Sequence, residues 1–309
     1  MNEPTVSVAI CAFDLARWDD LVAAVSSVNA QSSPPDELIV VIDHNDELLE
    51  RANSELQATV VASVGTRGLS GARNTATHLA RGEVLAFLDD DATAEPDWLA
   101  TLCKHFTDDS VHGVGGRAEP NWDSGRPAWF PGTFGWVIGC SYEGMPITAA
   151  PIRNLMGCNM AFRTAVLRSS GGFREDLGRV GRRPVGNEET ELCIRVRQQE
   201  PQGVFVYEPA ALVHHRVRDA RATWRYFAER CWAEGISKSA TVGYVGAEDG
   251  LASERTQLLQ VLPRAVRRGP ASETVAIGIG VACTGAGYVS GRARRRLARL
   301  SARREGGER

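Results

Sequence analysis

The first ninety residues of this 309-residue chain alternate short apolar runs with stretches of helical periodicity. Apolar runs of strand length lie at residues 6–13, 37–43, 58–64 and 83–88. Between them, apolar residues recur at the three- and four-residue spacing of an amphipathic helix, at 19–28, 48–56 and 71–80. Strands that alternate with helices form βαβ units, so we predict an α/β fold with a mainly parallel sheet flanked by helices.

The pattern is less regular after this region. Residues 113–151 are rich in Gly, Pro and Trp and have weak periodicity, which predicts long loops and short strands that cover a site. Helical spacing returns at 187–197 and at 223–234, and the apolar run 204–207 between them is typical of a strand.

Acidic residues follow three of the predicted strands. Asp14 ends the first, Asp43 the second, and Asp89, Asp90 and Asp91 follow the fourth. Ligands of open α/β sheets bind at the carboxyl ends of the strands. Acids at three such ends therefore indicate a binding site at this edge of the sheet.

Composition and charge add a distinction between the two ends of the chain. The formal net charge is −3, yet residues 291–309 contain eight Arg and two Glu. Such a basic end is typical of a segment that binds a partner or a membrane surface, and equally of a solvated tail. Seven cysteines without a CxxC pair argue against a disulfide framework and a zinc site. With no signal-peptide pattern at residues 1–10, we expect reduced thiols and a cytoplasmic location.

An uncharged segment, 275–289, precedes the basic end, and arginines lie on both sides of it. It is shorter than the roughly 20 apolar residues that a bilayer-spanning helix needs. We predict a re-entrant or interfacial helix at the inner face of the cell membrane. A helix that packs on the main domain is the alternative. The expected organisation is a main domain at 1–240 and a helical C-terminal extension at 241–309.

Two segments carry candidate phosphate and metal chemistry. The sequence FLDDDA at 87–92 places carboxylates two residues apart after a buried strand, where they can bind Mg²⁺ or Mn²⁺. Such a cation neutralises a diphosphate leaving group. Alone, the motif could equally be an acidic turn. The glycine-rich segment 65–74 opens a helix and carries Arg67 and Arg73, which suits an anion but matches no phosphate-binding fingerprint.

Two further segments carry candidate acid–base and ligand groups. Glu188 and Glu189 begin a helix in GNEETELCIR, where one can act as a general base or both can simply complement the helix dipole. His214 and His215 follow the strand at 204–207. A histidine pair is more often structural, but one imidazole could complete a metal site.

Taken in order, the segments VSVAICAFD, ELIVVID, GLSGARN, FLDDDA and GNEETELCIR and the later histidine resemble the family 2 glycosyltransferases with the GT-A fold. The resemblance covers roughly residues 5–240. PIRNLMGCNMAFR and GGFREDLGRVGRRP are similar to a branch that includes glucosyl-dolichyl-phosphate glucuronosyltransferases. The resemblance implies a metal-dependent, inverting transfer of a sugar from a nucleoside-diphosphate donor to a hydroxyl of a lipid-linked or small-molecule acceptor.

The resemblance also implies roles for individual residues. The donor's nucleotide side would be bound by Ala12, Asp14, Asp43, Arg73, Asp89 and Asp90. The metal would be held by Asp91, with Asp89 beside it, and by His215, with His214 as second choice. Glu189 would be the general base. The family usually has Asp at this position, so Glu188 remains the alternative base. The donor-sugar and acceptor side would include Gly157, Asn159, Trp232, Glu234, Gly235 and Lys238.

Partners follow from the same resemblance. The expected metal is Mn²⁺ or Mg²⁺ and the favoured donor is a UDP-sugar, with GDP and dTDP as alternatives. We expect peripheral membrane contact through the C-terminal segment and no nucleic-acid partner. A nucleotidyltransferase is a second hypothesis, but residues 12–17 lack its usual glycine-rich segment. A non-catalytic nucleotide-sugar-binding module is a third hypothesis, which degenerate acidic motifs would favour.

Overall fold

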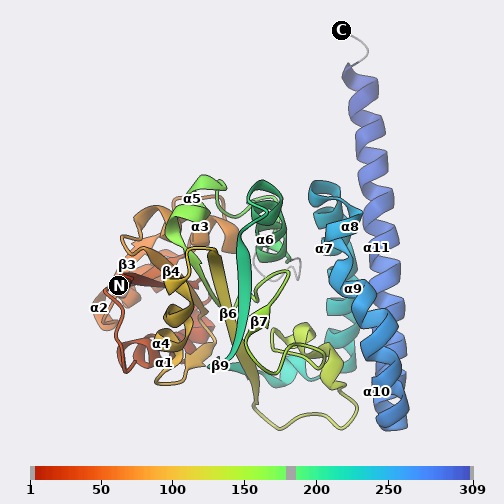
Figure 1. Cartoon of the computed structure of the whole chain (residues 1–309), viewed down its shortest axis with the longest axis horizontal. Helices are drawn as coiled ribbons and strands as arrows, with labels where there is room; N and C mark the ends of the chain where they lie inside the picture. The colour runs from red at the N-terminus through yellow and green to blue at the C-terminus, as the bar shows by residue number, and fades with distance from the viewer. Residues whose placement is uncertain (1–3, 179–185, 307–309) are drawn as a thin grey trace.

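The computed structural model describes residues 4–178 and 186–306, and its first half is a parallel sheet, as predicted (Figure 1). Four parallel strands lie in the order β3-β2-β1-β4. They are β1 Val6–Ala12, β2 Glu37–Ile42, β3 Thr59–Ala62 and β4 Val84–Asp89. The three inner strands are almost wholly buried, which explains why their sequences are continuous apolar runs and do not alternate.

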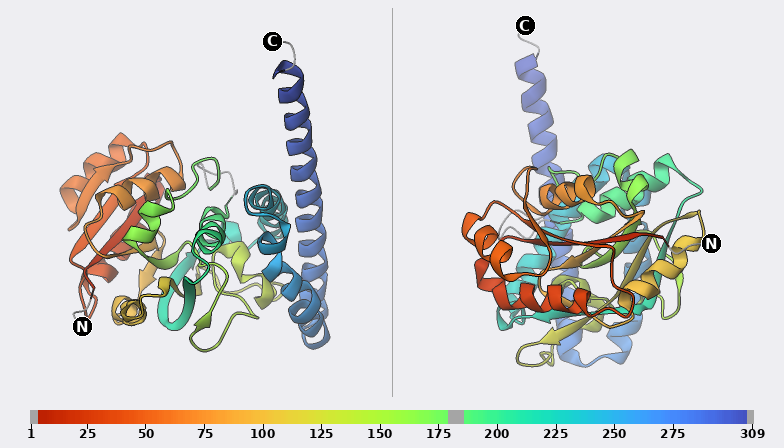
Figure 2. Two further views of the ribbon diagram at one scale, coloured as in Figure 1. Left: turned by 45° about the horizontal axis from the view of Figure 1, so that its top comes forward. Right: turned by 90° about the vertical axis from the view of Figure 1, so that its left-hand side faces the viewer.

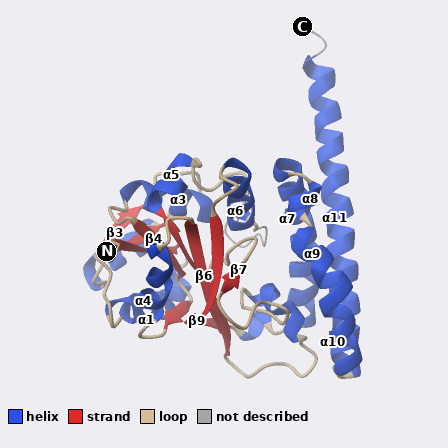
Figure 3. Ribbon diagram, in the orientation of Figure 1, coloured by secondary structure: helices blue, strands red, loops and turns tan. Residues whose placement is uncertain are grey.

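Helices cover both faces of this sheet (Figure 3). One face packs against α1 Trp18–Asn29, α2 Asp46–Glu55 and α4 Trp98–Cys103. The other packs against α3 Leu69–Leu79, α5 Thr164–Ser169 and α6 Glu188–Gln199. Successive β1 residues contribute to opposite cores, since Val8 and Ile10 face the first and Ala9 the second. Two short 3₁₀ turns, η1 Leu15–Arg17 and η2 Lys104–Thr107, follow β1 and α4.

The second half of the sheet is mixed and contains longer strands than the sequence predicted. β6 Val111–Trp122 and β9 Val204–Val217 run parallel to each other. Antiparallel partners complete the sheet: β8 Asn159–Arg163 with β4 and β6, and β5 Ala92–Ala94 and β7 Ala150–Pro151 with β9. The prediction of short strands and loops from residue 113 onward was wrong for β6. Its glycines weaken the strand signal, but a Cβ at Gly116 would collide with the Ala211 carbonyl and the Asn159 amide.

The C-terminal third is helical and packs beside the sheet (Figure 1). It comprises α7 Trp224–Val245, α8 Ala247–Gly250, α9 Ala252–Thr256, η5 Gln257–Val261, α10 Leu262–Arg268 and α11 Ala271–Gly306, after the short turn η4 Asp219–Arg221. Residue 240, the expected domain boundary, lies inside α7. α7 packs closely on α11 because Gly235, Gly287 and Gly291 remove side chains from the contact.

A third core joins these helices to η3 and to the end of β9. Phe130 and η3 Gly132–Ile138 pack against Phe227 of α7 and Ile277 of α11. Four cysteines lie in the three cores, and all seven are free thiols, as expected.

α11 is one continuous helix of 36 residues, about 54 Å long, and its C-terminal half extends beyond the rest of the molecule (Figure 2). The segment 275–289 is therefore part of a longer helix and not a short element of its own. One face packs on α7, as the alternative interpretation expected, while Val275 and Val289 are exposed. Over Ala271–Leu297 the helix is long and apolar enough to cross a membrane, a criterion that a core helix of a soluble protein can also meet.

Candidate active site

The carboxyl ends of β1, β2 and β4 form a small cavity of about 50 Å³. Four of the residues predicted to bind a nucleotide line it: Ala12, Asp43, Asp89 and Asp90. Asp43 accepts a hydrogen bond from the Gly68 backbone amide at 2.9 Å, so the glycine-rich loop closes over this edge of the sheet. Asp14 does not line the cavity, because its side chain accepts from the Ala16 amide and caps η1.

Asp89, Asp91 and His215 form a group that could hold a metal ion, with one ligand atom of each within 4.8 Å of the others. The sheet explains how residues so far apart in sequence meet. β5 pairs with β9 so that Ala92 lies opposite His215, which brings the preceding Asp91 beside the imidazole. The Asp91 carboxylate lies 3.1 Å from His215 Nε2.

The alternation of side chains along β9 distinguishes the two histidines. His215 points inward and is 3% exposed. His214 points to the opposite face, where its ring nitrogen lies 2.7 Å from Glu95. The structure thus brings the first-choice histidine to the acidic group and keeps the second-choice one away.

Two arginines that sequence reasoning missed neutralise this acidic group. Arg17 contacts Asp90 at 2.9 Å and Asp91 at 3.2 Å, and Arg221 contacts Asp91 at 3.1 Å. Burial would raise the pKa of Asp91, but His215 and the arginines hold it well below its usual range. Burial would lower the pKa of His215, but the Asp91 carboxylate raises it to about 10. A metal ion would therefore replace a proton on His215.

A larger cavity of about 490 Å³ continues from this group. Glu188 and Glu189 line it together with Asp89, Asp91 and His215. Glu188 is 3% exposed and accepts from the Arg73 guanidinium at 2.8 Å. Burial, followed by the neighbouring Glu188 charge, raises the pKa of Glu189 to about 8.

Arg73 fastens three segments of the site to one another. Besides Glu188, its guanidinium contacts Asp89 at 3.4 Å and donates to the Gly157 carbonyl at 2.9 Å. This buried arginine lies in the larger cavity and not in the small one. Arg73 therefore holds Asp89 and Glu188 in position, and Gly157 lines the larger cavity beside it.

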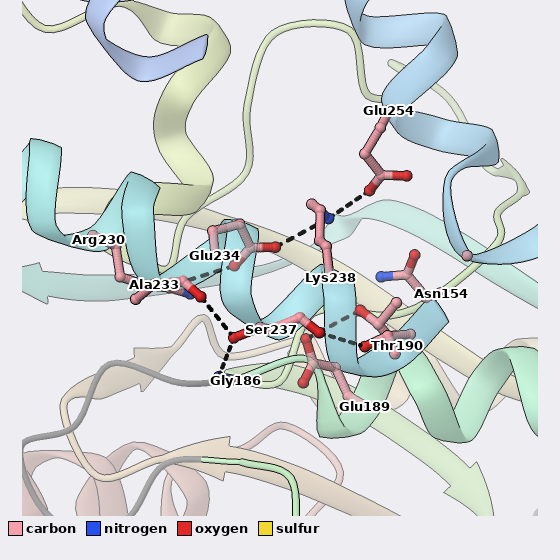
Figure 4. A network of polar contacts seen from close by, with 12 residues as sticks. Asn154, Gly186, Glu189, Thr190, Arg230, Ala233, Glu234, Ser237, Lys238 and Glu254 are labelled. Atoms are coloured by element: carbon pink, nitrogen blue, oxygen red, sulfur yellow. Dashed lines mark hydrogen bonds and ion pairs between the residues drawn. The ribbon is translucent and has the colours of Figure 1, made fainter. Parts of the chain in front are cut away.

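The residues predicted on the acceptor side are divided by the structure. Glu234 and Lys238 line the cavity, and Lys238 lies between Glu234 and Glu254 of α9 (Figure 4). Asn159 does not line it: the side chain is fully buried, accepts from Trp98 Nε1 and donates to the Arg117 and Ala211 carbonyls. Trp232 and Gly235 lie on the α11 side of α7, where their backbones contact Gly287 and Thr284.

A family model described as "Glycosyl transferase family 2" matches residues 7–171, which is more than half of the chain. The chain belongs to glycosyl transferase family 2. The match covers β1 to β4, the acidic motif and β8, and the glycosyltransferase interpretation of the sequence is confirmed.

Two curated relatives extend the similarity of this family 2 glycosyltransferase beyond residue 171. The glucosyl-dolichyl phosphate glucuronosyltransferase of Haloferax volcanii is 34% identical over 239 residues, 75% of this chain and 76% of that protein. The succinoglycan biosynthesis protein ExoM of Rhizobium meliloti is 24% identical over 286 residues, 85% and 87% of the two chains. The predicted branch is supported by the first of these.

Solved structures confirm the GT-A fold of the family 2 glycosyltransferase. The mannosyltransferase PcManGT of Pyrobaculum calidifontis, solved with GDP-Man and Mn²⁺, superposes with a TM-score of 0.60 at 18% identity, covering 96% of this chain and 88% of that one. GalNAc-T7, solved with UDP, GalNAc and Mn²⁺, gives 0.56 at 15% identity over 87% of this chain. The chain spans 58% of the length of GalNAc-T7.

Several cavity residues of the family 2 glycosyltransferase had no signal in its sequence. Trp136 of η3 lines the cavity but belongs to the segment 113–151 with weak periodicity, and Glu254 of α9 lies beyond the residues that the family resemblance covers. Arg230 could have been found, because it lies four residues before Glu234 on the same face of a predicted helix.

Proposed function

We propose that the protein is a metal-dependent inverting glycosyltransferase that moves a sugar from a UDP-sugar to a hydroxyl of a lipid-linked acceptor. One observation carries the proposal: a single cavity is lined both by Asp89, Asp91 and His215 and by Glu188 and Glu189. A leaving diphosphate and an attacking hydroxyl need these two kinds of group on either side of one sugar.

The acidic group fits a divalent cation. Two carboxylates and an imidazole are oxygen and nitrogen donors, and the nitrogen favours Mn²⁺ over Mg²⁺, which prefers oxygen alone. Asp89 is partly exposed, so its position remains accessible to a diphosphate. When bound, the ion neutralises the charge that develops on the diphosphate as its bond to the sugar breaks. Asp91 and His215, whose side chains are both buried, would hold the ion together with Asp89.

Glu189 is the proposed general base. It removes the proton of the acceptor hydroxyl as that oxygen forms its bond to the anomeric carbon, and the nucleoside diphosphate leaves from the opposite face. A carboxylate with a pKa of about 8 is a stronger base than an ordinary one, which suits deprotonation of an alcohol. Arg73 holds Glu188 in an ion pair and so leaves Glu189 as the carboxylate available to the acceptor.

The two substrates are proposed from the relatives. The Haloferax relative is named for a glucosyl-dolichyl phosphate acceptor, and GalNAc-T7 was solved with UDP. PcManGT was solved with GDP-Man, which keeps GDP as the alternative nucleotide in the test below.

We also propose that the protein works at the inner face of the cell membrane. The exposed side of α11 presents Val275, Ile279 and Val289. Arg267 and Arg268 precede these residues and Arg292 and Arg294 follow them, so both ends suit an anionic lipid surface. Co-sedimentation with phosphatidylglycerol vesicles, but not with phosphatidylcholine vesicles alone, is the expected result, and equal absence from both pellets would refute membrane contact.

Calorimetric titration with UDP, GDP and dTDP, with and without Mn²⁺, tests the donor site. We expect UDP to bind only with Mn²⁺, and Asp91→Asn to abolish this Mn²⁺-dependent binding. His214→Ala is the matched control, because this neighbouring histidine points away from the cavity. If no nucleotide binds in any condition, the donor-site assignment is wrong. Release of pyrophosphate from a nucleoside triphosphate would favour nucleotidyl transfer instead.

A further inference from the structure

The larger cavity has two ends of opposite character. Its polar end holds the acidic group, His215 and Glu189. Its C-terminal side, here called the apolar arm, is lined by Phe134, Met145, Leu258, Leu262 and Val281. These residues come from η3, the segment after it, and the C-terminal helices η5, α10 and α11. A ligand that fills the whole cavity must therefore be polar at one end and apolar at the other.

We propose that the apolar arm binds the hydrocarbon chain of the acceptor, while the hydroxyl-bearing head lies beside Glu189. The inference rests on the proposed function and adds to it the subsite that receives the chain. The C-terminal helices then belong to the active site, since they form one wall of the acceptor subsite.

Charged side chains that line the cavity on its C-terminal side are already paired within the protein. Lys238 is paired with Glu234 and Glu254, and Glu254 also accepts from Arg153 at 2.9 Å. Burial alone would raise the pKa of Glu254, but the Lys238 and Arg153 charges bring it down to about 2. A neutral chain can pass these paired groups without leaving an unpaired charge behind.

α11 connects the apolar arm with the surface of the molecule. Val281 lines the arm and is 38% exposed, so the arm opens at this helix. Gly285 and the exposed Val289 follow Val281 at four-residue spacing on the same side of α11, before the arginines that begin at Arg292. A chain held in a bilayer against this face would reach the arm without crossing water, which is why we assign the arm to a lipid chain and not to a soluble apolar metabolite.

Two glycines of α11 provide a matched pair for the test. Gly285 lines the apolar arm, and a Cβ at this position would meet no atom within 4 Å. Gly278 lies seven residues earlier on the same helix, is also exposed and is equally free of neighbours, but does not line the cavity. Gly285→Phe should therefore fill the arm, Gly278→Phe should not, and both replace a poor helix former at an uncrowded position.

The experiment is calorimetric titration of the full chain, saturated with UDP and Mn²⁺, with hexyl, octyl and decyl β-glucoside below their micelle concentrations. We expect binding to tighten by up to about fourfold for each added methylene that the arm buries. Gly285→Phe should abolish this dependence and weaken decyl glucoside binding at least about tenfold, while Gly278→Phe should behave as the unmodified protein.

Three outcomes would overturn the inference: no binding of decyl glucoside, no dependence on chain length, or a loss in Gly278→Phe that equals or exceeds the loss in Gly285→Phe. The last would mean that the chain binds the outer face of α11. The nucleotide titration separates this inference from the proposed function. If UDP and Mn²⁺ bind and the chain-length dependence is absent, only the apolar arm assignment fails.

Discussion

Glu189→Gln is the substitution that tests the proposed mechanism most directly. Glutamine keeps the shape of the side chain and removes the group that accepts the proton. General-base catalysis contributes roughly 10²–10⁴ in rate, so we expect kcat to fall by that factor, or about 3–5.5 kcal/mol of transition-state stabilisation. The assay is the steady-state release of UDP in the presence of an acceptor. Binding of UDP and Mn²⁺ should be unchanged, because Glu189 is not among the groups proposed to bind either.

The pH dependence of the same reaction gives a second readout. With a pKa raised to about 8 by burial and by Glu188, only about one tenth of Glu189 is ionised at pH 7. The rate should therefore rise about tenfold per pH unit below pH 8 and level off above it, and Glu189→Gln should lose this slope.

Thermal stability should respond in the opposite direction to activity. Because the folded protein binds the Glu189 proton more tightly than the unfolded chain, this group destabilises the fold progressively as pH rises from about 4.5 to about 8. The neutral glutamine removes that cost. We therefore expect the melting temperature of Glu189→Gln to exceed that of the unmodified protein at pH 8.5 and to match it at pH 4.5.

Glu188→Gln is the control, and it also shows how the reasoning can fail. Removal of the Glu188 charge should lower the pKa of Glu189 and shift the pH–rate profile to lower pH, with catalysis retained. It should also cost about 3 kcal/mol of folding stability, because the buried Arg73 loses its nearest partner. If Glu189→Gln keeps turnover within tenfold while Glu188→Gln abolishes it, the base is Glu188.

Three further predictions concern other parts of the site. Asn159→Ala should lower the free energy of unfolding by about 3 kcal/mol in urea denaturation, since it leaves Trp98 Nε1 and two buried carbonyls without partners. The UDP affinity of the folded protein should be unchanged, and a large loss of affinity would show that Asn159 belongs to the binding site. Lys238→Met should destabilise the fold by about 3–5 kcal/mol at pH 7, and Lys238→Met with Glu254→Gln by clearly less. Because Lys238 is the main cause that lowers the pKa of Glu254, its removal raises this pKa, and the difference between the two variants should shrink as pH falls and Glu254 takes up a proton. His215→Ala should weaken Mn²⁺ binding at least about tenfold and His214→Ala should not, measured by Mn²⁺ titration, and equal effects would contradict the metal group.

The parallel half of the fold could be predicted because its signals are local. β1, β2 and β4 are buried on both faces, so their apolar runs are continuous and short, and the helices between them carry apolar residues at regular spacing. The strand ends then indicated Asp43 and the aspartates 89–91 by position alone, and these residues line the two cavities. Nothing beyond the order of strands and helices was needed for this step.

Residues placed by long-range pairing could not be predicted in the same way. The motif position of Asn159 suggested a sugar contact, but its side chain instead joins Trp98 to the backbones of β6 and β9. β6 itself was missed because its glycines lower strand propensity for the same reason that they are needed, which is the close approach of Asn159 and Ala211. Such contacts depend on which strand lies next to which, and a local pattern does not contain that information.

The C-terminal helices show the same limit on a larger scale. In the sequence, residue 240 was the expected end of the main domain, because the resemblance to family 2 glycosyltransferases covers roughly residues 5–240. In the structure, α7 continues through this position and carries Arg230, Glu234 and Lys238 toward the cavity, while its other side packs on α11. Lys238 depends on Glu254 beyond that boundary for its second partner, and Phe227 depends on Ile277 for its packing. The segment that composition marked as an appendage is thus joined to the site by charge pairs and by a shared core, which is why its apolar wall can take part in acceptor binding.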